Sequence, residues 1–404
     1  MRILHTADLH LGKKLNKASR LDEQCDVIKE IAALADEHAA DVVLIAGDIF
    51  DASVPPSDAE RVFYRGLLTL AERGRAVIAL AGNHDDERRL CAAKPLADLQ
   101  GIVLAGELDY SALGSPSLTE PVPPPSLFEV AAAADYLQKQ RVKITGRFGG
   151  VTVQKGDEKV NIALVPYPSE GRLSRWAQQD YTVSYEERVK KTLADACAFF
   201  DSSAYNILCT HLFLTKSETA EALGGLAALP VSVLPQNADY IALGHVHKRF
   251  QVSKAPLAVY CGSPLQYAYD ESRAKSVTLV DTSARTVAAL PLSSGRKLTE
   301  TEADNYEECM AKLDFYKDDY VRLLYGGEPL GKDESAKIRA HAAFNDIAIT
   351  AQVRGNVCVE RRAHLSDDEI FDMYYKARYA APPSAELKAA FAELMQQLKS
   401  EGER

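Results

Sequence analysis

Short apolar runs recur along the chain, and each is followed at once by a glycine or threonine and then by a polar side chain. Runs this short, with several β-branched residues, predict buried strands. The runs are Val42–Ala46, Val77–Ala81, Ile207–Cys209 and Tyr240–Leu243. The polar residues are therefore predicted to begin where these strands end.

Helical periodicity lies between the early runs. Asp22–Ala39 carries apolar residues on one face, and Ser57–Glu60 fits a capping box that begins a second helix. Strands that alternate with helices predict an α/β sheet.

The pattern changes twice further along, which predicts three parts for a chain of 404 residues. Residues 1–292 are expected to form the first domain, which a proline-rich, loop-rich insertion interrupts at 107–150. After a short linker at 293–295, a small α+β domain is expected at 296–365. Residues 366–404 are expected to form two helices, whose apolar stripe either packs within the chain or binds a partner.

Composition and charge exclude only a few classes of protein. Hydrophobic residues make up 47% and charged residues 26%, which is typical of a soluble globular protein. The net charge of −10 argues weakly against nucleic-acid binding, but bound divalent cations supply local positive charge. The seven widely spaced cysteines predict reduced thiols rather than a disulfide framework. Because no segment fits a signal peptide or a membrane span, a cytoplasmic protein is expected.

Side chains that can bind metal ions directly follow the apolar runs. They are Asp8, His10, Asp48, Asn83, His84, His211, His245 and His247. In open α/β sheets, ligands bind beyond the carboxyl ends of the strands. Five separate segments are therefore predicted to deliver polar ligands to one edge of one sheet.

The residue types indicate which ions would bind there. A mixture of imidazole nitrogens with carboxylate and amide oxygens suits manganese, iron or zinc, and suits calcium poorly. Asp48 has two oxygens and can bridge two ions, and two ions about 3.5–4 Å apart can clamp a phosphate under attack. Asp8 with His10, and His245 with His247, are two residues apart, so each pair lies on one side of an extended segment.

Basic residues cluster after three of these polar positions. They are Lys13, Lys14, Lys17, Arg20, Arg88, Arg89, Lys248 and Arg249. They either contact the phosphates of a nucleic acid or form an ordinary solvated surface, and the sequence leaves both interpretations open.

The ordered set of motifs resembles that of the calcineurin-like metallophosphoesterases. It comprises Asp8–His10, Gly47–Asp51, Gly82–Asp85, His211 and Gly244–His247. Within that class, the segments His5–Gly12, Val165–Tyr167 and Gly262–Tyr267 are similar to the SbcD family of nuclease subunits. The resemblance fails over about 107–150 and is weaker beyond about 290.

The resemblance implies a four-layer β-sandwich flanked by helices, a small α+β capping domain and C-terminal helices. It also implies the site. One ion would be held by Asp8, His10, Asp48 and His247, and the other by Asp48, Asn83, His211 and His245. His84 would act on the substrate, Asp51 would orient His84, and manganese would be the preferred ion.

The resemblance further implies a manganese-dependent nuclease in DNA repair, recombination and replication. It would act as an exonuclease on double strands and an endonuclease on single strands and hairpins. Its partners would be DNA and an SbcC-type ATPase, gripped by residues 366–404, within a heterotetramer that contains a homodimer of this chain. The alternatives are another calcineurin-like phosphodiesterase, nucleotidase or protein phosphatase, and a non-catalytic scaffold.

Overall fold

The computed structural model describes residues 1–349 except 17, 99, 107, 109–140, 148, 177–182, 216–221 and 224–225, together with 383 and 387–388. Most of the predicted insertion and nearly all of the predicted C-terminal helices, 366–404, therefore lie outside the described residues. Residues Met1–Thr350 form one compact unit, and Ala351–Arg404 are a separate one.

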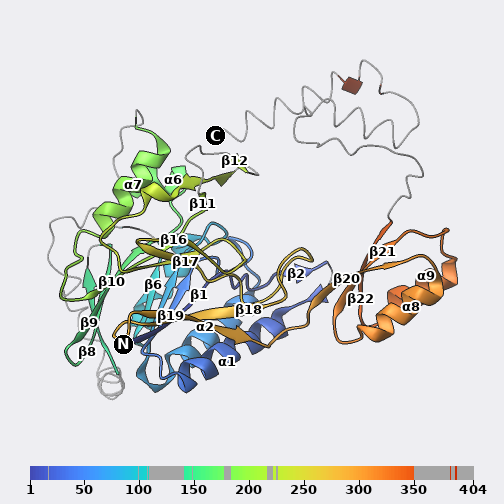
Figure 1. Ribbon diagram of the computed structural model, residues 1–404, viewed down its shortest axis with the longest axis horizontal. Coiled ribbons are helices and arrows are strands. Elements are labelled where there is room, and N and C mark those ends of the chain that lie inside the picture. Colours follow the sequence, from blue (N-terminus) through green and yellow to red (C-terminus); the bar gives the residue numbers. More distant parts are fainter. Residues whose placement is uncertain are drawn as a thin grey trace. The chain divides into compact units, whose positions relative to one another are not determined.

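Two large sheets form the centre of the first unit (Figure 1). The first sheet has six strands in the order β19 (Thr286–Leu292), β18 (Lys275–Asp281), β1 (Arg2–Thr6), β4 (Val42–Ala46), β5 (Ala76–Leu80) and β6 (Ile102–Ala105). The second has seven strands in the order β16 (Phe250–Lys254), β17 (Leu257–Tyr260), β15 (Tyr240–Gly244), β10 (Tyr205–His211), β9 (Glu158–Val165), β8 (Gly150–Lys155) and β7 (Lys143–Arg147). Each strand that precedes a polar motif has a parallel neighbour: β1 pairs with β4 and β4 with β5 in the first sheet, and β10 pairs with β15 in the second. The polar motifs therefore follow strands of two sheets, and the prediction of a single sheet was wrong.

The two sheets pack face to face, and helices cover their outer faces (Figure 1). Alternate residues of the strands, such as Ile3 and Ile207, form the apolar core between the sheets. The outer face of the first sheet packs against Phe63 and other apolar residues of two helices, and that of the second against Leu193. The helices are α1 (Leu21–Glu37) and α2 (Ser57–Ala71) on the first sheet and α7 (Tyr185–Ala196) on the second. The predicted four-layer sandwich is thus confirmed.

A third sheet follows β19 in the chain and has its own small core. Its three parallel strands and two helices are β20 (Leu298–Ala303), α8 (Tyr306–Phe315), β21 (Tyr320–Tyr325), α9 (Lys332–Ala340) and β22 (Phe344–Ile349). Leu313, Val321 and Ile338 are buried between the sheet and these helices. The sheet lies within the range predicted for the capping domain, and its role as a cap stays a prediction.

Shorter elements complete the described chain. They are β2 (Lys14–Leu15), β3 (Ala18–Ser19), η1 (Glu72–Gly74), α3 (Glu87–Cys91), α4 (Lys94–Asp98), α6 (Glu170–Trp176), β11 (Leu214–Thr215), β12 (Ala222–Leu223), β13 (Leu226–Ala227), β14 (Leu229–Pro230) and η3 (Val231–Val233).

Two local predictions were wrong. The residue that caps α2 is Pro56, and no side chain caps this end, because Ser57 is already the first helical residue. The end of the predicted loop-rich insertion is also regular, since β7 pairs with β8 at the edge of the second sheet. None of the helices in the described part of the chain combines the length and the apolar character that a membrane span requires.

Candidate metal centre

The loops that follow β1 and β4 run side by side and bring their polar residues together. The backbone amide of Asp8 donates to the carbonyl of Gly47, and that of His10 to the carbonyl of Asp48, each at 3.0 Å. Asp8, His10, Asp48 and His245 all have positive φ angles, between 43° and 100°. Residues other than glycine adopt such angles rarely, and strained positions of this kind concentrate at functional sites.

Glycines in these motifs leave room for the ligands. A Cβ atom on Gly82 would lie 2.1 Å from Oδ1 of Asp48, and one on Gly47 would lie 2.3 Å from Nδ1 of His211. Both distances are far inside van der Waals contact, so any larger residue would displace a candidate ligand. The glycines before Asp48 and Asn83 are therefore part of the site.

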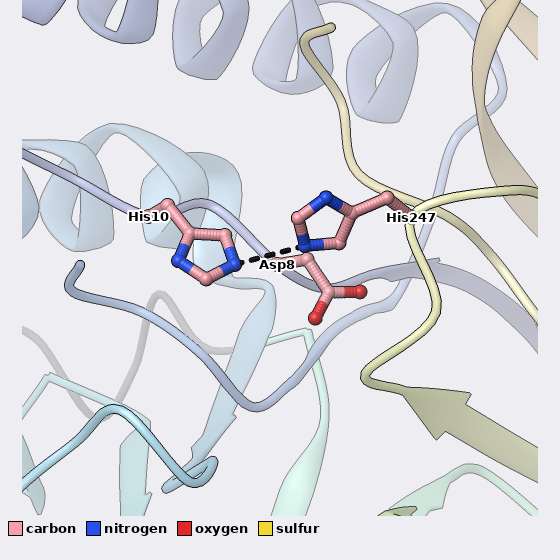
Figure 2. A group of neighbouring side chains, drawn as sticks. All are labelled: Asp8, His10 and His247. Carbon is pink, nitrogen blue, oxygen red and sulfur yellow. Dashed lines mark hydrogen bonds between the residues drawn. The ribbon is translucent and has the colours of Figure 1, made fainter. Parts of the chain in front are cut away.

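The first group of ligands is Asp8, His10 and His247 (Figure 2). The Nε2 atoms of His10 and His247 face each other at 3.0 Å, with the Asp8 carboxylate beside them. Asp8 is fully buried and accepts a hydrogen bond from the backbone amide of His245 at 2.9 Å. Ligand atoms that lie about 2.0–2.2 Å from one ion are separated from each other by roughly 3–3.5 Å, so the group fits an ion.

The second group is His211, His245 and Asn83. Oδ1 of Asn83 lies 3.0 Å from Nε2 of His211 and 3.0 Å from Nδ1 of His245, and the two nitrogens are 3.3 Å apart. Nδ1 of His211 donates to the carbonyl of Ala46 at 2.9 Å, so Nε2 is the ring nitrogen that faces Asn83. This group also fits one ion.

Asp48 lies between the two groups. Its Oδ2 is 3.4 Å from Nε2 of His211 and 3.7 Å from Nε2 of His10. Burial alone would raise the pKa of Asp48, but the charge and hydrogen bond of His211 lower the pKa below its usual range. Burial would likewise lower the pKa of His211, but the Asp48 carboxylate raises the pKa to about 9. One oxygen thus faces ligands of both groups, as a bridging carboxylate requires.

His84 borders this centre, but its contact with Asp51 differs from the expected one. Nδ1 of His84 lies 2.8 Å from the backbone carbonyl of Asp51, not from its carboxylate. The carboxylate instead accepts from Nζ of Lys13 at 2.7 Å and lies 3.5 Å from Nδ1 of His10. Asp51 therefore holds His84 through its main chain, and its side chain faces His10 and Lys13.

Three further residues support the centre: Asp85, which ends the Gly82–Asp85 motif, and two residues that belong to no motif, Arg172 and Glu271. Asp85 accepts from the amides of Ile49, Phe50 and Gly82 and so ties two ligand loops together. Arg172, from α6, donates to the carbonyls of Gly82 and Asp85 at 2.8 and 2.6 Å. Glu271 accepts from Nδ1 of His247 at 2.8 Å. The role of Glu271 could be found only from its contact with this histidine in the folded chain.

One of the basic residues thought to contact a nucleic acid does not face solvent. Arg20 is only 2% exposed, pairs with Glu23 and lies over the rings of Tyr267 and Tyr320. It joins α1 to the segment that enters the third sheet, so a direct contact with a nucleic acid is excluded for Arg20 in this conformation. Lys14 and Lys248 are exposed.

Comparisons with known proteins show the family of the chain. Residues 1–249 match the model of the family described as calcineurin-like phosphoesterase. The SbcD subunit of the nuclease SbcCD from Bacillus subtilis (strain 168) is 32% identical over 99% of both chains. The equivalent subunit from Escherichia coli (strain K12) is 30% identical over 69% of this chain and 64% of its own length. The chain therefore belongs to the calcineurin-like phosphoesterases and, within them, to the SbcD family.

Proposed function

We propose that this chain is the nuclease subunit of an SbcCD-type complex and hydrolyses phosphodiester bonds in DNA with two divalent ions, preferably manganese. The position of Asp48 carries the proposal, because one of its oxygens lies between imidazole nitrogens of two separate ligand groups. The names of the relatives supply the nuclease activity and the partner complex.

Each ion would have its own ligands, with Asp48 shared. One set is Asp8, His10, Asp48 and His247, and the other is Asp48, Asn83, His211 and His245. When bound, such ions stabilise the negative charge that develops on the phosphate during in-line attack. The protein contributes by holding the ligands in place: the backbone amide of His84 donates to Oδ1 of Asp48 at 2.9 Å, which turns Oδ2 toward the ligand imidazoles.

His84 would move the proton to the leaving oxygen. Because Nδ1 of His84 is held by the carbonyl of Asp51, Nε2 is the ring nitrogen that can gain and give a second proton. His84 is half-buried, so a substrate can reach it. Asp51 would fix the ring through its carbonyl, and its carboxylate would position His10 and Lys13.

The specific nuclease activities proposed here are those that membership of the SbcD family implies. The chain would act as an exonuclease on double strands and an endonuclease on single strands and hairpins. It would work as a homodimer that is joined to SbcC-type ATPase subunits in a heterotetramer, and residues 366–404 would contact the ATPase. Such a complex would serve DNA repair, recombination and replication.

DNA would approach through a cavity beside the metal centre. The cavity has a volume of about 590 Å³ and lies between β2, the loop after β17 and the third sheet. Its lining includes Lys14, Arg322, Tyr269 and Tyr267, together with two carboxylates, Asp270 and Glu300, of which Glu300 pairs with Arg322. The ring of Tyr267 also contacts His10, with 5.4 Å between ring centroids, so the cavity adjoins the ligands. Cations and aromatic faces are the groups that bind phosphates and bases.

The direct test is cleavage of end-labelled linear DNA by the purified chain in Mn²⁺, with and without a chelator. A chromogenic phosphodiester is assayed beside the DNA. Cleavage of both substrates that the chelator abolishes is the expected result. Hydrolysis of the small diester without DNA cleavage, even after an SbcC-type partner is added, would contradict DNA as the substrate.

Lys14→Ala should weaken DNA binding and reduce its salt dependence. Each lost phosphate contact lowers the slope of log affinity against log salt concentration by about 0.9 for duplex DNA. Binding is measured by fluorescence anisotropy over a salt series in a chelator, so that no cleavage occurs. Lys191→Ala, which removes a 75% exposed lysine of α7, is the matched control. An equal slope in the wild type and Lys14→Ala would exclude the contact.

A further inference from the structure

Glu271 uses both of its carboxylate oxygens beside the metal centre. Oε1 accepts from Nδ1 of His247 at 2.8 Å. Oε2 accepts from Nζ of Lys275 at 2.7 Å and from the backbone amide of Tyr267 at 3.1 Å. The Glu271 side chain is 14% exposed and the Lys275 side chain 7%, so water weakens these contacts little.

We propose that Glu271 is a positioning residue that sets the affinity of one ion only, the one assigned to Asp8, His10, Asp48 and His247. The inference rests on the ligand sets proposed above. It concerns a residue in the loop between β17 and β18 that belongs to none of the motifs of the site.

The contact with His247 acts directly on a ligand atom. A carboxylate at Nδ1 keeps the proton on that nitrogen, so Nε2 carries the lone pair that faces Nε2 of His10 at 3.0 Å. The carboxylate also makes the imidazole a stronger base and fixes the rotation of its ring. Loss of Glu271 would leave His247 free to rotate or to place its proton on Nε2, and both changes would weaken the binding of the ion.

Glu271 also acts on His10 through Tyr267. The Tyr267 ring lies against the rings of His10 and His247, with centroids 5.4 and 5.9 Å apart. Its hydroxyl donates to the carbonyl of Leu9, next to His10 in the chain. The backbone of Tyr267 is held by Glu271 at 3.1 Å. One carboxylate therefore braces two imidazoles of the same ligand set.

The other ion has a different kind of support. Its ligand His211 is oriented by the neutral carbonyl of Ala46 at 2.9 Å, on β4 and far in sequence from Glu271. Within the described chain, the hydrogen bonds of the Glu271 carboxylate do not reach Asn83, His211 or His245. The two ions should therefore respond differently to the loss of this one carboxylate.

The test is titration of the full-length chain with Mn²⁺ alone, followed by calorimetry, with no DNA present. The wild type should bind two ions. In Glu271→Gln, one ion should bind about 10–100-fold more weakly, the range found for residues that support metal ligands, while the other changes by no more than about twofold. Asp270→Asn is the matched control, because it removes one carboxylate from the adjacent, exposed residue.

A second variant separates positioning from folding. Glu271→Gln leaves the buried Lys275 ammonium without its anion, so Glu271→Gln combined with Lys275→Met removes both charges. Thermal unfolding in a chelator should be similar for this pair and the wild type, and the selective loss of one ion should persist. Unchanged affinity for both ions, an equal loss of both, or the same loss in Asp270→Asn would overturn the inference. Failure of the wild type to bind two ions would instead contradict the ligand assignment itself.

Discussion

Asp48→Asn should reduce Mn²⁺-dependent DNA cleavage by at least about 10³-fold. Removal of a single donor to a developing negative charge costs about 10²–10³-fold in other hydrolases, and Asp48 is placed to support two ions. The asparagine keeps the shape of the side chain and loses its charge. Because Oδ2 of Asp48 lies 3.4 and 3.7 Å from ligands of both groups, both ions should bind more weakly.

Cleavage is measured as the initial rate at saturating Mn²⁺, and bound manganese is counted by elemental analysis after gel filtration. The matched control is Asp58→Asn, which removes an exposed carboxylate from α2. The variant should bind fewer ions than the wild type, and the control should bind the same number. Full occupancy by two ions in Asp48→Asn would contradict a bridging role, whatever the loss of activity.

The sequence predicted which candidate ligands lie close together, and within each sheet the chain direction explains why. Each candidate ligand follows an apolar run, and parallel strands end at one edge of a sheet. The structure adds the reason for the glycines at 47 and 82: a residue without a Cβ is needed where Asp48 and His211 approach the backbone. The two-sheet sandwich itself came from resemblance, because alternating strands and helices do not specify how many sheets form.

The supporting residues could not be predicted in the same way. Arg172 contacts Gly82 from a position 90 residues later in the chain, and Glu271 lies 24 residues beyond His247 in a loop. A single arginine or glutamate carries no periodic signal of its own. The contact between Asp51 and His84 was misassigned for a similar reason: residue types suggest side-chain pairs, but the orientation of a carbonyl depends on backbone geometry that the sequence does not display.

His84→Ala should lower DNA cleavage by about 10²–10⁴-fold and leave the number of bound manganese ions unchanged. A side chain that transfers a proton in the transition state typically contributes this much. Nδ1 of His84 is engaged by the carbonyl of Asp51, so its contribution comes from Nε2, which is not placed in either ligand set. This result would distinguish the role of His84 from that of Asp48, because replacement of Asp48 should remove bound ions as well as activity.

Proton transfer by His84 is tested with a second substrate, whose leaving group needs no proton. In a nitrophenyl phosphodiester, the nitrophenolate group leaves without being protonated. His84→Ala should therefore slow the hydrolysis of this diester much less than the cleavage of DNA. His38→Ala, which removes an imidazole at the end of α1, controls for the loss of a histidine. If His84→Ala slows both substrates equally with two ions bound, His84 stabilises charge on the phosphate and does not deliver a proton. If it loses an ion, His84 belongs to the metal centre, and its neighbours His10 and Asp48 explain why.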